Sequence, residues 1–161
     1  MASAMPDRDA GPGVRLPPPL VFLAGLGLGF LLQRIAPLAF AAQGQPLPRW
    51  LGGLLALGSA ALALWAFRTF HRAHTTVRPD RSASTLLTGG PFRFTRNPLY
   101  LSLSLLHAGL AFLANALWPA LMLVPVLLLI RYHVIAREER HLLGLFGAEY
   151  QAYCRRVRRW F

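Results

Sequence analysis

Two short polar clusters flank a long apolar stretch in the second half of the chain. Arg96, Asn97 and Tyr100 form the first cluster, and Glu138 and Glu139 form the second. Ionised carboxylates accept hydrogen bonds from hydroxyl and ammonium groups, and a guanidinium pairs with a carboxylate through two parallel bonds. If the two clusters meet, they can together bind a zwitterionic ligand that carries hydroxyl groups.

The elements between the clusters predict that they do meet. Residues Asn115 to Pro119 have the composition of a turn, because the residue before a proline avoids the helical conformation. Asn97 lies 20 residues before Leu117, and Glu138 lies 21 residues after it. At a rise of about 1.5 Å per residue both are about 30 Å from the turn, so an antiparallel helical pair returns them to one depth.

A purely structural interpretation of the same residues stays open. Asn97 followed by Pro98 is a typical helix start, with the asparagine as the cap and the proline at the first helical position. The two glutamates can face water or pair with Arg137 and Arg140. Spacing alone therefore leaves both a ligand site and ordinary helix ends open.

The composition indicates a membrane protein. Of the 161 residues, 55% are hydrophobic and 14% are charged, whereas soluble domains carry about 25% charged residues. A transmembrane helix needs about 20 apolar residues. Four segments approach this length: Leu20 to Ala42, Trp50 to Phe70, Leu99 to Trp118, and Pro119 to Ile135. We predict an all-α integral membrane helical bundle of about four transmembrane helices, with 1–19 as a flexible lead-in and 20–161 as one domain.

The tail after Arg137 has a different pattern from the four spans. Its apolar residues recur three or four positions apart, which predicts an amphipathic C-terminal helix. These residues are Leu142, Leu145, Phe146, Tyr150, Tyr153 and Val157.

The first span has an alternative interpretation as a signal peptide. Ala39-Phe40-Ala41 resembles a cleavage motif, but Arg34 and Pro37 lie between it and the apolar run. We therefore predict a retained transmembrane helix.

Arginine distribution predicts the orientation. The net charge is +11, and all 17 basic residues are arginine. Arg34 and Arg49 lie on one side of the four spans, and the other fifteen lie on the opposite side. The positive-inside rule then places both termini of this integral membrane protein in the cytoplasm, and in a bacterium the membrane is the cytoplasmic one. Topology explains the charge, so we expect membrane lipids and no nucleic acid as partners.

A haem or di-iron centre is the remaining alternative, and the histidine spacing disfavours it. His107 and His133 lie at depths that differ by about 9 Å in the predicted hairpin, and a di-iron site needs several more histidines. We predict no metal.

Both polar clusters belong to longer motifs. Thr88 to Tyr100 reads Thr-Gly-Gly-Pro-Phe-Arg-Phe-Thr-Arg-Asn-Pro-Leu-Tyr, and Glu138 begins Glu-Glu-Arg-His-Leu, followed by Phe146-Gly147 and two spaced tyrosines. These motifs resemble those of the isoprenylcysteine carboxyl methyltransferase family. Phospholipid methyltransferases share the Arg-x-Pro and Glu-Glu elements. The resemblance covers about residues 70–160.

The resemblance implies an all-helical membrane methyltransferase that uses S-adenosyl-L-methionine. A glutamate would hold the polar end of this cofactor, Arg96 would meet its carboxylate, and glycine would allow close approach of the chain. The implied cofactor-binding residues are Thr85, Leu86, Leu87, Gly90, Phe92, Arg96, Asn97, Pro98, Leu99, Tyr100, Glu138 and Glu139.

Two positions depart from the family pattern. Ser84 replaces a histidine of eukaryotic relatives, and Val134 replaces an arginine that relatives use for the substrate. Arg131 and Arg137 are the nearest arginines, and we assign them to substrate binding. No catalytic residue is assigned, because a carboxylate or thiolate acceptor needs no general base. For an amine or hydroxyl acceptor, His141 and Glu139 are the nearest bases.

The predicted function is methylation of a small lipophilic acceptor, such as a carboxylate, a thiol or a lipid. A non-enzymatic membrane protein that retains the methyltransferase-like fold is the alternative.

Overall fold

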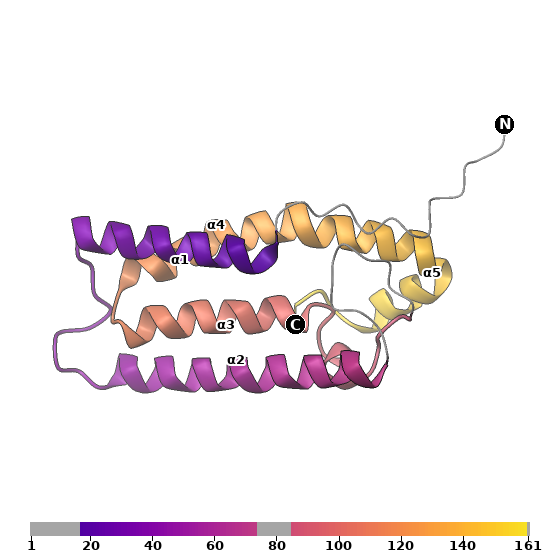
Figure 1. The fold of residues 1–161 in the computed structure, drawn as a ribbon, viewed down its shortest axis with the longest axis horizontal. Coiled ribbons are helices and arrows are strands. Elements are labelled where there is room, and N and C mark those ends of the chain that lie inside the picture. The colour runs from indigo at the N-terminus through magenta and orange to yellow at the C-terminus, as the bar shows by residue number, and fades with distance from the viewer. Residues whose placement is uncertain (1–16, 74–84, 161) are drawn as a thin grey trace.

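The computed structural model describes residues 17–73 and 85–160, and the regular elements in these ranges are all helical (Figure 1). A 3-10 helix precedes α3, and a π-helix joins α4 to α5 without a break. The elements are α1 (Pro18–Ile35), α2 (Leu47–Arg72), η1 (Gly90–Arg93), α3 (Pro98–Leu113), α4 (Leu117–Leu129), η2 (Ile130–Ile135) and α5 (Ala136–Arg156). Helix α2 packs along α3, α1 packs along α4, and α3 also contacts α4.

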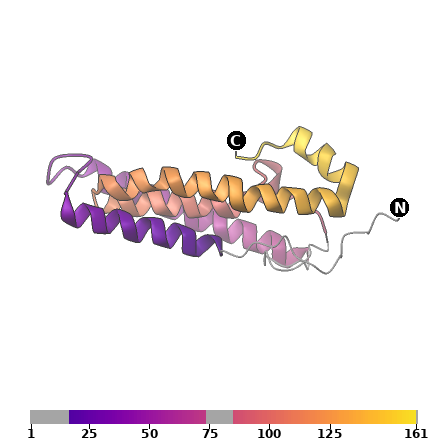
Figure 2. The ribbon, with the colours of Figure 1, turned by 90° about the horizontal axis from the view of Figure 1, so that it is seen from above.

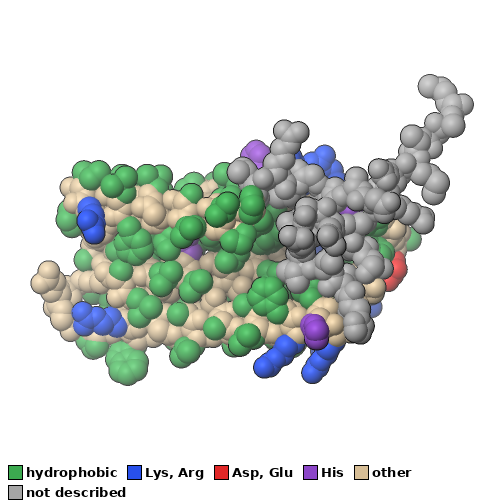
Figure 3. Space-filling view, viewed as in Figure 1, with side chains coloured by type: hydrophobic (Ala, Val, Ile, Leu, Met, Phe, Trp, Pro, Cys, Tyr) green, Lys and Arg blue, Asp and Glu red, His purple; other side chains and the backbone are tan. Residues whose placement is uncertain are grey.

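The lengths and composition of the helices confirm the predicted membrane bundle. Among the described residues, three helices are long and apolar enough to cross a membrane: Pro18–Ile35, Leu47–Arg72 and the helical run Leu117–Arg156. Helix α3 is apolar but shorter, at 16 residues. Figure 3 shows hydrophobic side chains along the bundle and arginines toward its two ends, as a bilayer requires.

The helical run that begins at Leu117 is too long to lie wholly in a membrane. Its part before Gly147, residues 117–146, is 30 residues or about 45 Å long, against a hydrocarbon thickness of about 30 Å. Its apolar half ends with η2, and α5 carries the charged residues that follow. The glutamates at the start of α5 therefore lie beyond the membrane-spanning part.

Proline positions explain where helices differ from the predicted spans. The first helix ends at Ile35 rather than at residue 42, because Pro37 disfavours a helical conformation at Ala36. Helix α3 ends at Leu113 rather than at residue 118, and Asn115 in the following turn has a φ of 49°. Helix α4 already begins at Leu117, since a proline is tolerated in a first helical turn.

Asn115 ties the α1–α2 connection to the α3–α4 turn. Its Oδ1 accepts hydrogen bonds from the backbone N–H groups of Phe40 and Ala41, both at 3.2 Å, and its Nδ2 donates to the Ala41 carbonyl at 2.8 Å. The Phe40 ring also stacks on Phe112, with centroids 4.3 Å apart. The segment that resembles a cleavage motif is thus packed into the bundle.

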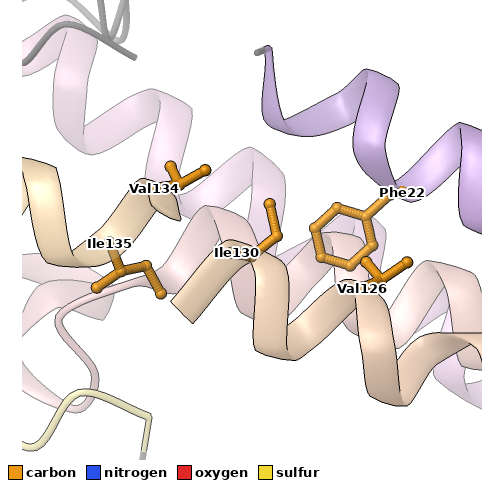
Figure 4. Packing of buried hydrophobic residues seen from close by; sticks show 5 residues of the cluster. All are labelled: Phe22, Val126, Ile130, Val134 and Ile135. Carbon is orange, nitrogen blue, oxygen red and sulfur yellow. The ribbon is translucent and has the colours of Figure 1, made fainter. Parts of the chain in front are cut away.

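A buried apolar cluster holds α1 against the helix formed by α4 and η2. Figure 4 shows Phe22 of α1 beside Val126 and Ile130, with Val134 and Ile135 one turn further along. Val134 is only 1% exposed, so the arginine of family relatives at this position would be buried among apolar side chains. Burial of an unpaired charge there would be costly.

Helix α5 is the amphipathic C-terminal helix that the sequence predicts, and it is bent. Gly147 has φ 49° and ψ −119°, a non-helical conformation that divides α5 in two. Figure 2 shows the second half turning back toward the bundle. The predicted apolar face still forms a cluster, in which Tyr150, Tyr153 and Val157 are buried against Leu142 and Phe146.

Candidate active site

The connection from η1 to α3 forms one wall of the site. Phe92 is buried, its ring lies edge-to-face with Phe70 at 5.4 Å, and its carbonyl accepts a 2.7 Å bond from the Tyr153 hydroxyl. Gly90 has a φ of 57°, and a Cβ there would collide with the side chain of Thr69. Glycine is therefore required where this wall passes α2.

Tyr100 and Glu138 connect the two predicted clusters directly. The Tyr100 hydroxyl donates a 2.5 Å hydrogen bond to Oε1 of Glu138. The two residues come from α3 and α5, so the prediction that an antiparallel hairpin brings them together is confirmed. Burial raises the pKa of Glu138 to about 7, with a smaller contribution from the neighbouring Glu139 charge, while the bond from Tyr100 lowers it.

Glu139 is held by two arginines. Arg159 donates from Nε to Oε1 at 3.0 Å and from Nη2 to Oε2 at 2.5 Å, which is the bidentate arrangement. Nη1 of Arg96 lies 3.1 Å from Oε1 of Glu139 and also donates to Sγ of Cys154 at 2.7 Å. The bonds to Glu139 raise the pKa of Arg159 above its ordinary value.

The segment 157–160, which follows α5, closes over the start of α3. The Arg158 carbonyl accepts a 3.0 Å bond from the backbone N–H of Arg96. The Arg159 carbonyl accepts bonds from Thr95 Oγ1 at 3.1 Å and Asn97 Nδ2 at 2.9 Å. Trp160 packs against the apolar cluster that includes Tyr100. In Figure 1 the chain accordingly returns from α5 to the start of α3.

This closure changes the role of Asn97. The residue occupies the N-cap position and Pro98 begins α3, as predicted, but the Asn97 side chain makes no capping bond. Its amide reaches the Arg159 carbonyl instead. The cap was predicted from local sequence, which does not show the distant carbonyl that competes for the side chain.

The other implied cofactor residues differ in burial. Leu86 packs on the cluster of Tyr150 and Tyr153. Pro98 is buried at the helix start, Leu87 and Leu99 are half-buried, and Thr85 is exposed. Ser84 lies outside the described residues.

The arginines assigned to the substrate lie on the surface. Arg131 is exposed, and its guanidinium lies 5.6 Å from the ring centroid of Tyr132. Arg137 is exposed in the first turn of α5. His141, one turn after Glu138, has its Nε2 buried and without a hydrogen-bond partner among the described residues. Burial lowers the pKa of His141, which favours the neutral ring.

Three residues that sequence reasoning did not assign complete the site. Arg159 holds Glu139, Cys154 accepts a bond from Arg96, and Tyr153 ties α5 to the Phe92 carbonyl. The available signal was the arginine-rich end of an amphipathic helix, which is equally typical of a solvated face. The bend at Gly147 turns the part of α5 that precedes and carries these side chains back toward the bundle (Figure 2).

The donor set fits a zwitterionic ligand with hydroxyl groups. Nε of Arg96 is buried and has no hydrogen-bond partner among the described residues, so a guanidinium donor remains available. The carboxylate of Glu138 accepts a bond from Tyr100 and retains further acceptor capacity. Carboxylates, guanidiniums and a phenol thus gather at one end of an apolar bundle.

The comparisons with known proteins identify a family for this chain. Residues 47–149, more than half of the chain, match the model of a family described as phospholipid methyltransferase. No curated protein and no solved structure matches the chain. The matched family is related to the isoprenylcysteine carboxyl methyltransferases, which confirms the resemblance found in the motifs. With apolar helices long enough to span a bilayer and a match that includes both polar clusters, the chain belongs to the phospholipid methyltransferase family.

Proposed function

We propose that this membrane methyltransferase uses S-adenosyl-L-methionine and methylates a small lipophilic acceptor. The observation that carries the proposal is the meeting of Tyr100 with Glu138 and of Arg96 with Glu139 at one end of the bundle. Family membership supports methyl transfer, and the donor set supports a zwitterionic cofactor. When bound, this cofactor supplies an electrophilic methyl group on a sulfonium.

The acidic and basic residues of the site would bind different groups of the cofactor. Glu138 is the carboxylate for the ribose hydroxyls or the amino group, because Glu139 is already engaged by two arginines. Tyr100 fixes the orientation of Glu138, and Nε of Arg96 is the donor for the ligand carboxylate. A positioned nucleophile and exclusion of water then suffice for transfer.

The acceptor reaches the site from the bilayer. The described helices expose leucine and aromatic side chains along their lengths, and these face lipid in a membrane. A carboxylate or thiolate acceptor needs no base. An amine acceptor, such as a phospholipid headgroup, must lose a proton. We assign His141, whose Nε2 is buried and without a partner among the described residues, as the base in that case.

A methyl-transfer assay separates the acceptor classes. Purified protein is incubated with methyl-labelled cofactor and either a lipid extract of its native host or farnesylcysteine analogues. We expect label in a lipid fraction, lost in Tyr100→Ala. Turnover of the prenylcysteine with none in the extract would overturn the acceptor class. No label in any fraction, together with no cofactor binding, would favour the non-enzymatic alternative.

The same proposal places the site in the cytoplasm. Arg34 lies in the last turn of α1 and Arg49 in the first turn of α2, at one end of the bundle, while Arg68, Arg72 and the site arginines lie at the other. The positive-inside rule then orients the arginine-rich end, with both termini, toward the cytoplasm. Reporter fusions at residue 44 and after residue 161 should report opposite sides. The same side for both would contradict this topology.

A further inference from the structure

Arg159 lies outside both sequence motifs but forms hydrogen bonds with residues of each. Its guanidinium donates both bonds to Glu139, and its carbonyl accepts from Thr95 and Asn97. The side chain thus engages the second motif, while the backbone engages the first. One residue of the segment 157–160 therefore connects the start of α3 to the start of α5.

The side chains of Arg96, Glu139 and Arg159 are partly buried, and their hydrogen bonds restrict where each of them can lie. The side chains of Glu139 and Arg96 are 19% and 15% exposed, and that of Arg159 is 31% exposed. A guanidinium that donates two parallel bonds fixes both the distance and the plane of its carboxylate. Arg96 shares Oε1 of Glu139 with Arg159, so the position of Arg96 depends on how Glu139 is held.

Resting on the proposed function, we infer that Arg159 is a positioning residue for cofactor binding. It fixes Glu139, and Glu139 in turn aligns the Arg96 guanidinium, whose Nε is unpartnered among the described residues. Glu138 is left as the carboxylate that meets the ligand. Arg159 acts through Glu139 and does not itself touch the cofactor.

The neighbouring Arg158 provides a matched control. Its side chain is exposed, and its carbonyl, which a substitution keeps, accepts the bond from the Arg96 backbone. Replacement of either arginine by glutamine removes one positive charge from the same segment. A general effect of surface charge would therefore lower the cofactor affinity equally in both variants. A positioning role of Arg159 would lower it only in Arg159→Gln.

The experiment measures cofactor affinity by calorimetry on the detergent-purified full chain. The variants are Arg159→Gln, Arg159→Lys, Arg158→Gln, Glu139→Gln and the double variant Arg159→Gln with Glu139→Gln. We expect roughly tenfold weaker binding in Arg159→Gln, a smaller loss in Arg159→Lys, and none in Arg158→Gln. In the Glu139→Gln background, Arg159→Gln should produce no further loss, because the group it acts through is gone.

The outcomes separate this inference from the proposed function. Suppose that the wild type binds the cofactor. Unchanged affinity in Arg159→Gln, or an equal loss of affinity from Arg159→Gln in the wild-type and Glu139→Gln backgrounds, would then overturn only the positioning role. A loss of affinity that merely follows a lowered thermal midpoint, without partial recovery in Arg159→Lys, would also overturn it. If Arg159→Gln does not fold, the test is Arg159→Lys, and unchanged cofactor affinity in that variant would overturn the positioning role. Absence of binding in the wild type contradicts both proposals.

Discussion

The Tyr100 hydroxyl donates a 2.5 Å hydrogen bond to Oε1 of Glu138, although the residues are 38 positions apart. The bond connects the first turn of α3 to the first turn of α5, at the depth where the apolar part of the bundle ends. It therefore links the family motif around Arg96 to the paired glutamates. Both the stability and the ionisation of the site depend on this contact.

Tyr100→Phe should destabilise the protein while keeping the ring. The change removes the donor and leaves a buried carboxyl oxygen without its bond, which costs about 1–3 kcal/mol in the free energy of unfolding. Tyr132→Phe is the control, because Tyr132 is 61% exposed. Chemical unfolding in detergent measures both variants, and equal losses would show that the Tyr100 contact has no special weight.

The pH dependence of stability should reveal Glu138. Its pKa is about 7 in the folded protein against 4.5 for an unperturbed carboxyl, so the folded state binds the proton more tightly. The protonated Glu138 side chain therefore contributes to the free energy of unfolding. This contribution is fully present below pH 4.5 and is lost as the pH rises through 7, by up to ~3 kcal/mol. The wild type should therefore lose stability relative to Glu138→Gln between pH 5 and pH 8. An identical pH slope in both proteins would refute the shifted pKa.

Hydrophobic patterning and antiparallel geometry were enough to predict the helical bundle and the meeting of Tyr100 with Glu138. Helix ends were less well predicted, because the role of a proline depends on whether it follows a helix, as Pro37 does, or lies in a first turn, as Pro119 does. Arg159 could not be predicted, because its position depends on the non-helical conformation of Gly147 within a segment of helical pattern.

Substitution of Gly147 tests whether the bend is built into the backbone. Gly147 has φ 49° and ψ −119°, and an alanine in such a sparsely populated conformation costs about 1–3 kcal/mol. Gly144→Ala is the matched control, because a Cβ meets nothing within 4 Å at either position. In an ordinary helical turn, alanine should stabilise by about 1 kcal/mol. The thermal unfolding midpoint should therefore fall in Gly147→Ala and rise in Gly144→Ala. Shifts of the two midpoints in the same direction would contradict the bend.

The close packing of α2 on α3 gives a second matched pair. A Cβ on Gly52 would lie 2.5 Å from the backbone nitrogen of Leu113 and 2.7 Å from the Gly109 carbonyl oxygen. Gly52→Ala should therefore separate the helices at a cost of about 1–3 kcal/mol. At Gly53 a Cβ meets nothing within 4 Å, so Gly53→Ala should be neutral or stabilising. Comparable unfolding midpoints for the two variants would disagree with this helix contact.

Cofactor binding to the purified protein tests the central proposal most directly. Calorimetry in detergent compares the wild type with Glu138→Gln and with Glu149→Gln, which removes an exposed carboxylate elsewhere on α5. Loss of a charged hydrogen bond is worth about 1.5–3 kcal/mol, so Glu138→Gln should bind S-adenosyl-L-methionine roughly 10- to 100-fold more weakly. Glu149→Gln should bind like the wild type. No binding by the folded wild type, or equal affinity in all three proteins, would contradict the site.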